Sequence, residues 1–156
     1  MTNLEAIYNF AQVSEQIATS GQPKAEQFDL IKAAGYQVVV NLASGTTKYD
    51  LPDEATIVKN LDLEYHHIPV DWENPRMSDL EAFFTVMDAN QDKPVFVHCI
   101  ANYRVSAFVM LYRVIKQGIA LADAQALKAR AWNLEEAVPT WDDFIALALK
   151  QHGVED

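Results

Sequence analysis

The sequence predicts an α/β fold, a single domain over residues 1–156 with a central, mostly parallel sheet of about four to five strands flanked by helices. Short β-branched runs alternate with helical stretches, which is the pattern of βαβ units. Residues 36–42 form a near-continuous apolar run, typical of a strand buried on both faces. Hydrophobic residues make up 50% of the chain, enough for a substantial core, and its 156 residues suit one domain.

The elements follow one another without a repeat or a low-complexity linker. Gly35 and Gly118 are placed to end helices, and the motifs at 78–81 and 140–143 resemble capping boxes that begin helices. The expected strands cover residues 13–19, 36–42, 63–70 and 94–98. The expected helices cover residues 24–34, 54–61, 78–90, 104–117, 121–132 and 140–151.

Charge and composition exclude several classes of partner. The chain has 12 basic and 22 acidic residues, a formal net charge of −10, so its surface repels nucleic acid and anionic membranes. No apolar run approaches the ~20 residues that a membrane span needs. Residues 1–10 contain Glu5 and no basic residue, unlike a signal peptide, so we expect a cytoplasmic protein. Oligomeric state is not predicted.

Cys99 is the one cysteine of the chain. An intrachain disulfide is therefore impossible, and nothing in the sequence suggests a thiolate metal site, so we expect neither a metal nor a cofactor. An isolated cysteine is by default a small buried hydrophobic residue. Only its neighbours argue for a different role.

The neighbours of Cys99 predict an anion-binding loop. Strand 94–98 delivers Cys99 to the carboxyl end of the sheet, where ligands bind in parallel α/β folds. The next helix points its free N–H groups and its dipole at the same place, which favours an anion such as a thiolate. Arg104 adds a planar, two-pronged donor for an oxyanion, and Ser106 is placed to donate a hydrogen bond to the thiolate. The expected anion-binding residues are Ile100, Ala101, Asn102, Tyr103 and Arg104.

The segment from His98 and Cys99 to Arg104 resembles the signature loop of the cysteine-dependent tyrosine and dual-specificity phosphatases. Residues 19–23 and 35–42 resemble the opening of a bacterial family of phosphatase-like domains, formerly a domain of unknown function, some of them fused to β-lactamase-like hydrolases. This resemblance covers residues 13–115. It implies phosphomonoester hydrolysis through a phosphocysteine, with His98 orienting the loop and a phosphorylated small molecule or phosphoprotein as substrate.

The loop departs from that pattern in its length. Phosphatases of this class have five residues between cysteine and arginine, whereas four separate Cys99 from Arg104 here, and Val105 stands at the usual arginine position. The usual glycine is missing, and we expect Asn102 to take its positive-φ conformation. Counted with Cys99 and Arg104 themselves, the loop has six residues, a length typical of rhodanese-like sulfurtransferases. A sulfurtransferase that carries a persulfide on Cys99, with its sulfur taken from a sulfur donor, is therefore an alternative function. A non-catalytic anion-binding module is another.

Asp71 is the expected general acid. It follows strand 63–70, lies at the same sheet edge as Cys99 and precedes Cys99 by 28 residues, a spacing similar to that of dual-specificity phosphatases. Phosphoryl transfer from a monoester needs such a proton donor, whereas sulfur transfer does not. Glu73 is the alternative acid, and Asp71 as a solvated loop residue is the simpler interpretation. Trp72, Tyr103 and Tyr49 either line the mouth of the site or pack in the interior.

Overall fold

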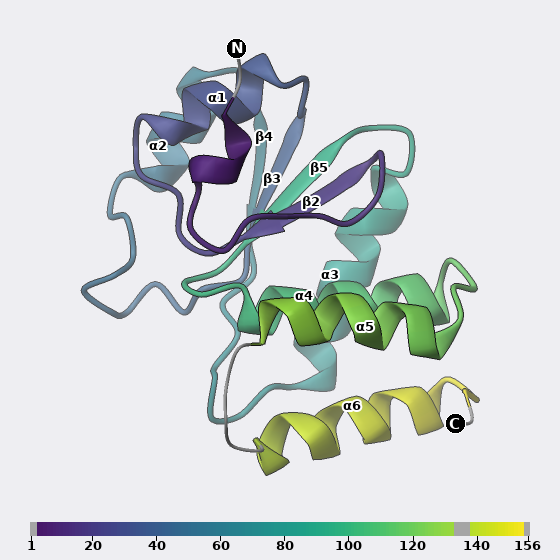
Figure 1. The fold of residues 1–156 in the computed structure, drawn as a ribbon. Helices are drawn as coiled ribbons and strands as arrows, with labels where there is room; N and C mark the ends of the chain where they lie inside the picture. Colours follow the sequence, from purple (N-terminus) through teal and green to yellow (C-terminus); the bar gives the residue numbers. More distant parts are fainter. Residues whose placement is uncertain (1–2, 133–137, 155–156) are drawn as a thin grey trace.

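The computed structural model describes residues 3–132 and 138–154. Its centre is a five-stranded sheet in the order β1-β2-β5-β3-β4, in which β1 runs antiparallel to β2 and the other pairs are parallel (Figure 1). The mostly parallel α/β fold is therefore confirmed. The strands are β1 (Ala11–Gln12), β2 (Ile17–Ser20), β3 (Val38–Asn41), β4 (Glu64–His67) and β5 (Val95–His98).

The helices cover both faces of the sheet, as Figure 1 shows. The 3-10 helix η1 and helices α1 and α2 lie on one face, and α3, α4 and α6 pack on the other with α5 against α4. The helices are η1 (Leu4–Ala6), α1 (Gln27–Ala33), α2 (Glu54–Asn60), α3 (Met77–Ala89), α4 (Tyr103–Ile115), α5 (Leu121–Ala131) and α6 (Pro139–Gln151).

The period of two along each strand divides the core into two clusters. Val39 and Phe96 face the α1–α2 side, where they pack with Phe28, while Val40 and Val97 face the α3–α4 side. Both faces are covered, so all four residues of each of β2, β3 and β5 are buried. Burial of β3 on both faces explains why the sequence of residues 36–42 is an almost continuous apolar run.

Three expectations about element boundaries were wrong. The strand expected over 63–70 is the four-residue edge strand β4, although backbone pairing with β3 continues as far as Val70, whose N–H donates to Leu42 O. Neither expected capping box forms, because each helix begins one residue before its Ser or Thr. Pro139 takes the first position of α6, which its fixed φ favours. The two-residue β1 was not predicted because it is too short to show a period.

The register of the sheet brings polar residues together at its carboxyl edge. Ser20, Asn41 and His98 are partners at the ends of β2, β3 and β5, and the chain continues from His98 through Cys99 into α4. The expected meeting of strand end and helix start is therefore present. Among the described residues, no helix is long and apolar enough to cross a membrane.

Candidate active site

The loop from Cys99 to Asn102 joins β5 to α4 within four residues. Asn102 has φ 72° and ψ 6°, the left-handed conformation expected for it, and precedes the first helical residue of α4. Its side-chain Nδ2 donates to Asn9 O and to Thr19 Oγ1, at 2.9 and 3.0 Å. Asparagine therefore replaces the usual glycine without losing the turn, because it tolerates this conformation and its amide finds buried partners.

Most backbone amides of this loop have no acceptor among the described residues. Within residues 3–132 and 138–154, the N–H groups of Ile100, Ala101, Asn102, Arg104 and Val105 donate to no protein atom, whereas Cys99 N donates to Ser20 O. Asn102 also provides no side-chain cap for α4. A run of free amides around a left-handed residue at a helix N-terminus forms a concave site for an anion.

Arg104 adds a buried positive charge to this site. The residue is 9% exposed, and its Nη1 donates to Val70 O at 2.9 Å. No carboxylate of the described residues lies within ion-pair distance of its guanidinium. Burial of an unpaired charge is costly, and a guanidinium has five donors, so Arg104 retains the capacity to hold an oxyanion.

The outer side of the loop is bound to two upstream segments. Asn9 Nδ2 donates to Ala101 O at 2.8 Å, and Gln22 N donates to Ile100 O at 2.9 Å. A Cβ added to Gly21 would lie 2.5 Å from Ile100 O and 2.6 Å from the Tyr8 ring, so only glycine permits this approach. Residues 19–23, which carry part of the family resemblance, therefore support the cysteine loop.

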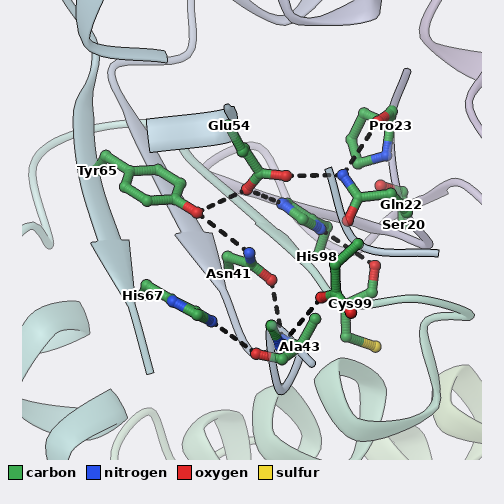
Figure 2. Close-up of polar contacts among 12 residues, drawn as sticks. Ser20, Gln22, Pro23, Asn41, Ala43, Glu54, Tyr65, His67, His98 and Cys99 are labelled. Atoms are coloured by element: carbon green, nitrogen blue, oxygen red, sulfur yellow. Dashed lines mark hydrogen bonds and ion pairs between the residues drawn. The ribbon is translucent and has the colours of Figure 1, made fainter. Parts of the chain in front are cut away.

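His98 links the loop to a carboxylate of α2. Its Nδ1 lies 3.1 Å from Cys99 O, and its Nε2 lies 2.7 Å from Glu54 Oε2, with both side chains almost fully buried. Glu54 also accepts hydrogen bonds from Gln22 Nε2 and from the Tyr65 hydroxyl. Figure 2 shows this carboxylate surrounded by its three partners, while the Cys99 sulfur points away from the network.

Both ring nitrogens of His98 have buried partners. A carbonyl oxygen only accepts, so the contact with Cys99 O places a proton on Nδ1. Burial alone would raise the pKa of Glu54, but attraction to His98 and hydrogen bonds from His98, Gln22 and Tyr65 hold it below its usual value. Burial and the nearby Glu54 charge raise the pKa of Tyr65, which keeps its hydroxyl a donor.

Cys99 itself is 1% exposed and packs in the core cluster on the α4 side of the sheet. Ser106 does not stabilise its sulfur, because the Ser106 hydroxyl donates to Tyr103 O at 3.1 Å and accepts from Trp132 Nε1 at 2.7 Å. The expected hydrogen bond from Ser106 is thus corrected, since its single proton is used elsewhere. The loop amides and Arg104 supply the positive environment instead.

Asp71 lies in an exposed loop whose backbone is fixed on both sides. Arg104 donates to the carbonyl of Val70, and Trp141 Nε1 donates to the carbonyl of Trp72 at 2.7 Å. The Trp72 ring packs against Tyr103, Trp132 and Trp141. Trp72 and Tyr103 are therefore packing residues that tie the Asp71 loop to α4, α5 and α6.

Sequence reasoning missed Glu54 and the support from Tyr8 and Asn9. Glu54 pairs with a histidine 44 residues away, and Asn9 reaches a carbonyl 92 residues away. In the sequence, Glu54 is visible only as a carboxylate at the start of a short helix, and carboxylates at such positions are commonly exposed to solvent. Clusters of three or more metal-ligating side chains are not found in the described part of the chain.

A mostly parallel sheet that leads a cysteine, a short amide-rich loop and an arginine into a helix is the arrangement expected of cysteine-dependent tyrosine and dual-specificity phosphatases. Comparison with known families shows this class. The family model described as "DSP-PTPase phosphatase fused to NAD+ Kinase" matches residues 3–142, and the chain belongs to this family. The description names the matched domain a phosphatase of the dual-specificity and tyrosine type. The sulfurtransferase alternative rested on loop length, whereas the family model that matches is that of a phosphatase.

Individual relatives agree with this assignment. A candidate phosphatase (DUF442) of Shewanella putrefaciens CN-32 is 39% identical, with a TM-score of 0.86 over 96% of both chains. A β-lactamase hydrolase-like protein of Xylella fastidiosa is 28% identical over 83% of this chain. The chain spans only 30% of the length of that relative.

More distant structures share the fold. The core catalytic domain of the PP-IP phosphatase SIW14 from S. cerevisiae is 16% identical with a TM-score of 0.72, over 91% of this chain and 86% of that one. TpbA of P. aeruginosa, in complex with phosphotyrosine, is 17% identical with a TM-score of 0.69, over 91% and 90%. The bacterial phosphatase-like family expected from the sequence is thus confirmed, including its relation to β-lactamase-like hydrolases.

The buried Glu54–His98 pair predicts a pH-dependent stability. The pKa of Glu54 is lower in the folded state than its unfolded value near 4.5. The contribution of the Glu54 carboxylate to the free energy of unfolding is therefore complete above the unfolded pKa and is lost as the pH falls through the folded pKa. We expect Glu54→Gln to lower the free energy of unfolding by about 3 kcal/mol at pH 7, and by less as the pH falls below the unfolded value and through the folded one. Urea unfolding of the wild type and the variant across this pH range measures the free-energy difference at each pH.

Glu64→Gln is the matched control, because Glu64 lies 2.6 Å from His66 but both side chains are substantially exposed. Its cost should stay below ~1 kcal/mol. Equal costs of the two substitutions at pH 7 would contradict a structural role for the buried pair.

Proposed function

We propose that this chain hydrolyses phosphomonoesters with Cys99 as the nucleophile. The observation that carries the proposal is the site around Cys99: free loop amides and a buried Arg104 that no described carboxylate neutralises. A dianionic phosphoryl group would accept hydrogen bonds from the loop amides and pair with the Arg104 guanidinium at the same time. The hydrogen bond between His98 Nδ1 and Cys99 O fixes the backbone that carries the nucleophile.

The reaction proceeds in two steps. The Cys99 thiolate attacks phosphorus, the Sγ–P bond forms, and the P–O ester bond breaks, while Arg104 and the loop amides hold the equatorial oxygens. The leaving oxygen takes a proton from Asp71. Water then attacks the phosphocysteine and gives its proton to Asp71, and inorganic phosphate leaves as the thiolate is restored.

The position of the Asp71 loop supports this role for Asp71. Arg104 holds the carbonyl immediately before Asp71, so the residue that binds the phosphoryl group also positions the acid. Asp71 Oδ1 accepts from Glu73 N at 2.9 Å, which leaves Oδ2 as the carboxyl oxygen for proton transfer.

The proposed substrates are phosphorylated small molecules or phosphoproteins. TpbA binds phosphotyrosine and SIW14 is a PP-IP phosphatase, so phosphorylated ligands suit this fold. A net charge of −10 restricts anion binding to the local site. A cytoplasmic setting belongs to the proposal, because a nucleophilic thiol needs reducing conditions.

Turnover of p-nitrophenyl phosphate tests the proposal. Cys99→Ser should remove activity, and Arg104→Lys should lower kcat/KM about 10²–10³-fold because lysine cannot reproduce the planar donor pair. Arg130→Lys, at an exposed position of α5, is the matched control and should leave activity unchanged. Phosphate binding without wild-type turnover would instead support a non-catalytic anion-binding module, and equal turnover by Cys99→Ser would contradict Cys99 as the nucleophile.

The acid is tested by the dependence of rate on the leaving group. Asp71→Asn should lower kcat for phenyl phosphate about 10²-fold or more, and should affect p-nitrophenyl phosphate less, because nitrophenolate needs no proton to leave. Glu73→Gln should change neither rate. If Glu73→Gln shows the leaving-group dependence and Asp71→Asn does not, Glu73 is the acid.

A further inference from the structure

The carbonyl groups on either side of Asp71 are held by two buried side chains from different helices. Arg104 of α4 donates from Nη1 to Val70 O at 2.9 Å, and Trp141 of α6 donates from Nε1 to Trp72 O at 2.7 Å. Arg104 also binds the phosphoryl group in the proposed reaction, whereas Trp141 takes no part in the chemistry at phosphorus. The hydrogen bond from Trp141 to the backbone beside the proposed acid therefore needs its own explanation.

Burial makes this hydrogen bond difficult to exchange for one with water. Trp141 is 0% exposed, and an indole has a single N–H donor and no acceptor. If the Trp72 carbonyl moved away, the indole N–H would be left without a partner inside the protein, which costs more than the loss of a hydrogen bond at the surface. The bond thus holds the carbonyl of the residue after Asp71 in one position.

The helix that carries Trp141 is itself fixed to the helix that carries Arg104. The centroid of the Phe108 ring of α4 lies 6.0 Å from that of Trp141 and 5.9 Å from that of Phe144, both of α6. The Trp72 ring also stacks on the Trp141 ring, at 5.4 Å. Two helices that pack against each other therefore provide the donors on both sides of the proposed acid, so the core rather than the loop sets the positions of these donors.

Hydrogen bonds within the loop connect the Asp71 carboxyl group to this support. Asp71 Oδ1 accepts from Glu73 N at 2.9 Å, and Asn74 N donates to Asp71 O at 3.2 Å. These bonds make the turn from Asp71 to Asn74 one unit, so a displacement of the Trp72 carbonyl also moves the carboxyl group. Asp71 is exposed, and its orientation therefore depends on its backbone rather than on packing around its side chain.

We propose that Trp141 is the positioning residue of the general acid, which makes α6 a part of the active site. The inference rests on the proposed function, in which Asp71 protonates the leaving oxygen. The indole N–H fixes the carbonyl after Asp71 and Arg104 fixes the carbonyl before it, so the carboxyl group is held in one orientation before substrate binds. A misplacement of about 1 Å can slow a reaction about 10²-fold, so this support acts directly on the rate.

The dependence of kcat/KM on the leaving group tests the inference. Trp141→Phe retains an aromatic ring but removes the N–H donor. We expect it to lower kcat/KM for phenyl phosphate about tenfold, and for p-nitrophenyl phosphate by less than about twofold, because only phenolate needs the proton of Asp71. The Kd of inorganic phosphate should be unchanged, since the loop amides and Arg104 are left intact.

A double-mutant cycle separates positioning of the acid from a general loss of structure. In the Asp71→Asn background, Trp141→Phe should have no further effect on the ratio of the two kcat/KM values, because the proton donor that Trp141 positions is absent. A general loss of structure would instead lower both values in both backgrounds. Equal losses for the two substrates, or an effect on the ratio that persists in the Asp71→Asn background, would overturn the role of Trp141.

Trp132→Phe is the matched control. Both indole rings pack against the Trp72 ring, with centroids 5.5 Å away for Trp132 and 5.4 Å away for Trp141. The Trp132 N–H, however, donates to Tyr103 O and Ser106 Oγ rather than to the loop that carries the acid. Trp132→Phe should therefore leave the ratio of the two kcat/KM values at its wild-type level. The same change of ratio in both variants would contradict a specific role for the Trp141 hydrogen bond.

Hydrogen exchange of the wild-type chain gives a readout that requires neither turnover nor a variant that folds. The Asn74 amide should exchange with the same urea dependence as the amides of α6, because the loop does not open unless α6 releases it. Exchange of Asn74 through an opening that leaves α6 protected would overturn the inference. Absence of Cys99-dependent turnover in the wild type would overturn the proposed function and the role of Trp141 together, whereas wild-type turnover with an unchanged ratio in Trp141→Phe would overturn the role of Trp141 alone.

Discussion

The structure depends on a concentration of positive charge that the protein does not neutralise itself. The buried guanidinium of Arg104 and the free amides after Cys99 converge where β5 meets α4. The chain carries a net charge of −10, yet no described carboxylate reaches this guanidinium. Burying this uncompensated positive charge costs free energy, and an anion bound beside it offsets that cost. The anion is the Cys99 thiolate, a bound phosphoryl group, or first one and then the other.

The rest of the fold holds this site rigid. On one side, the hydrogen-bonded Glu54–His98 pair joins α2 to the carbonyl of Cys99, and its carboxylate is further held by Gln22 and Tyr65. Arg104 joins the loop to the backbone that carries Asp71. The proposed nucleophile, anion donors and acid are thus connected through hydrogen bonds before any substrate arrives, which is the preorganisation that catalysis of phosphoryl transfer requires.

Local pattern was sufficient to predict the order of the major helices and parallel strands, the strand–loop–helix around Cys99 and the left-handed Asn102. It failed where long-range contacts decide the outcome. The carboxylate partner of His98 lies 44 residues away in the sequence, and the acceptor of Arg104 lies 34 residues away. The Ser106 hydroxyl accepts a hydrogen bond from Trp132 and donates its proton to Tyr103 O. No periodicity encodes these pairings. Helix starts were misplaced by one residue where sequence resembled a cap that the backbone does not use.

Burial of Cys99 makes its reactivity the sharpest test of the whole account. At 1% exposure, an ordinary structural thiol would be inert, whereas a thiolate held at the bottom of an oxyanion loop reacts with small reagents that enter through that loop. The measurement is the rate of iodoacetamide labelling of Cys99 at pH 6 to 7, followed by mass spectrometry with and without inorganic phosphate. We expect rapid labelling that phosphate suppresses. A sulfur that stays unlabelled while the protein is folded would contradict the account.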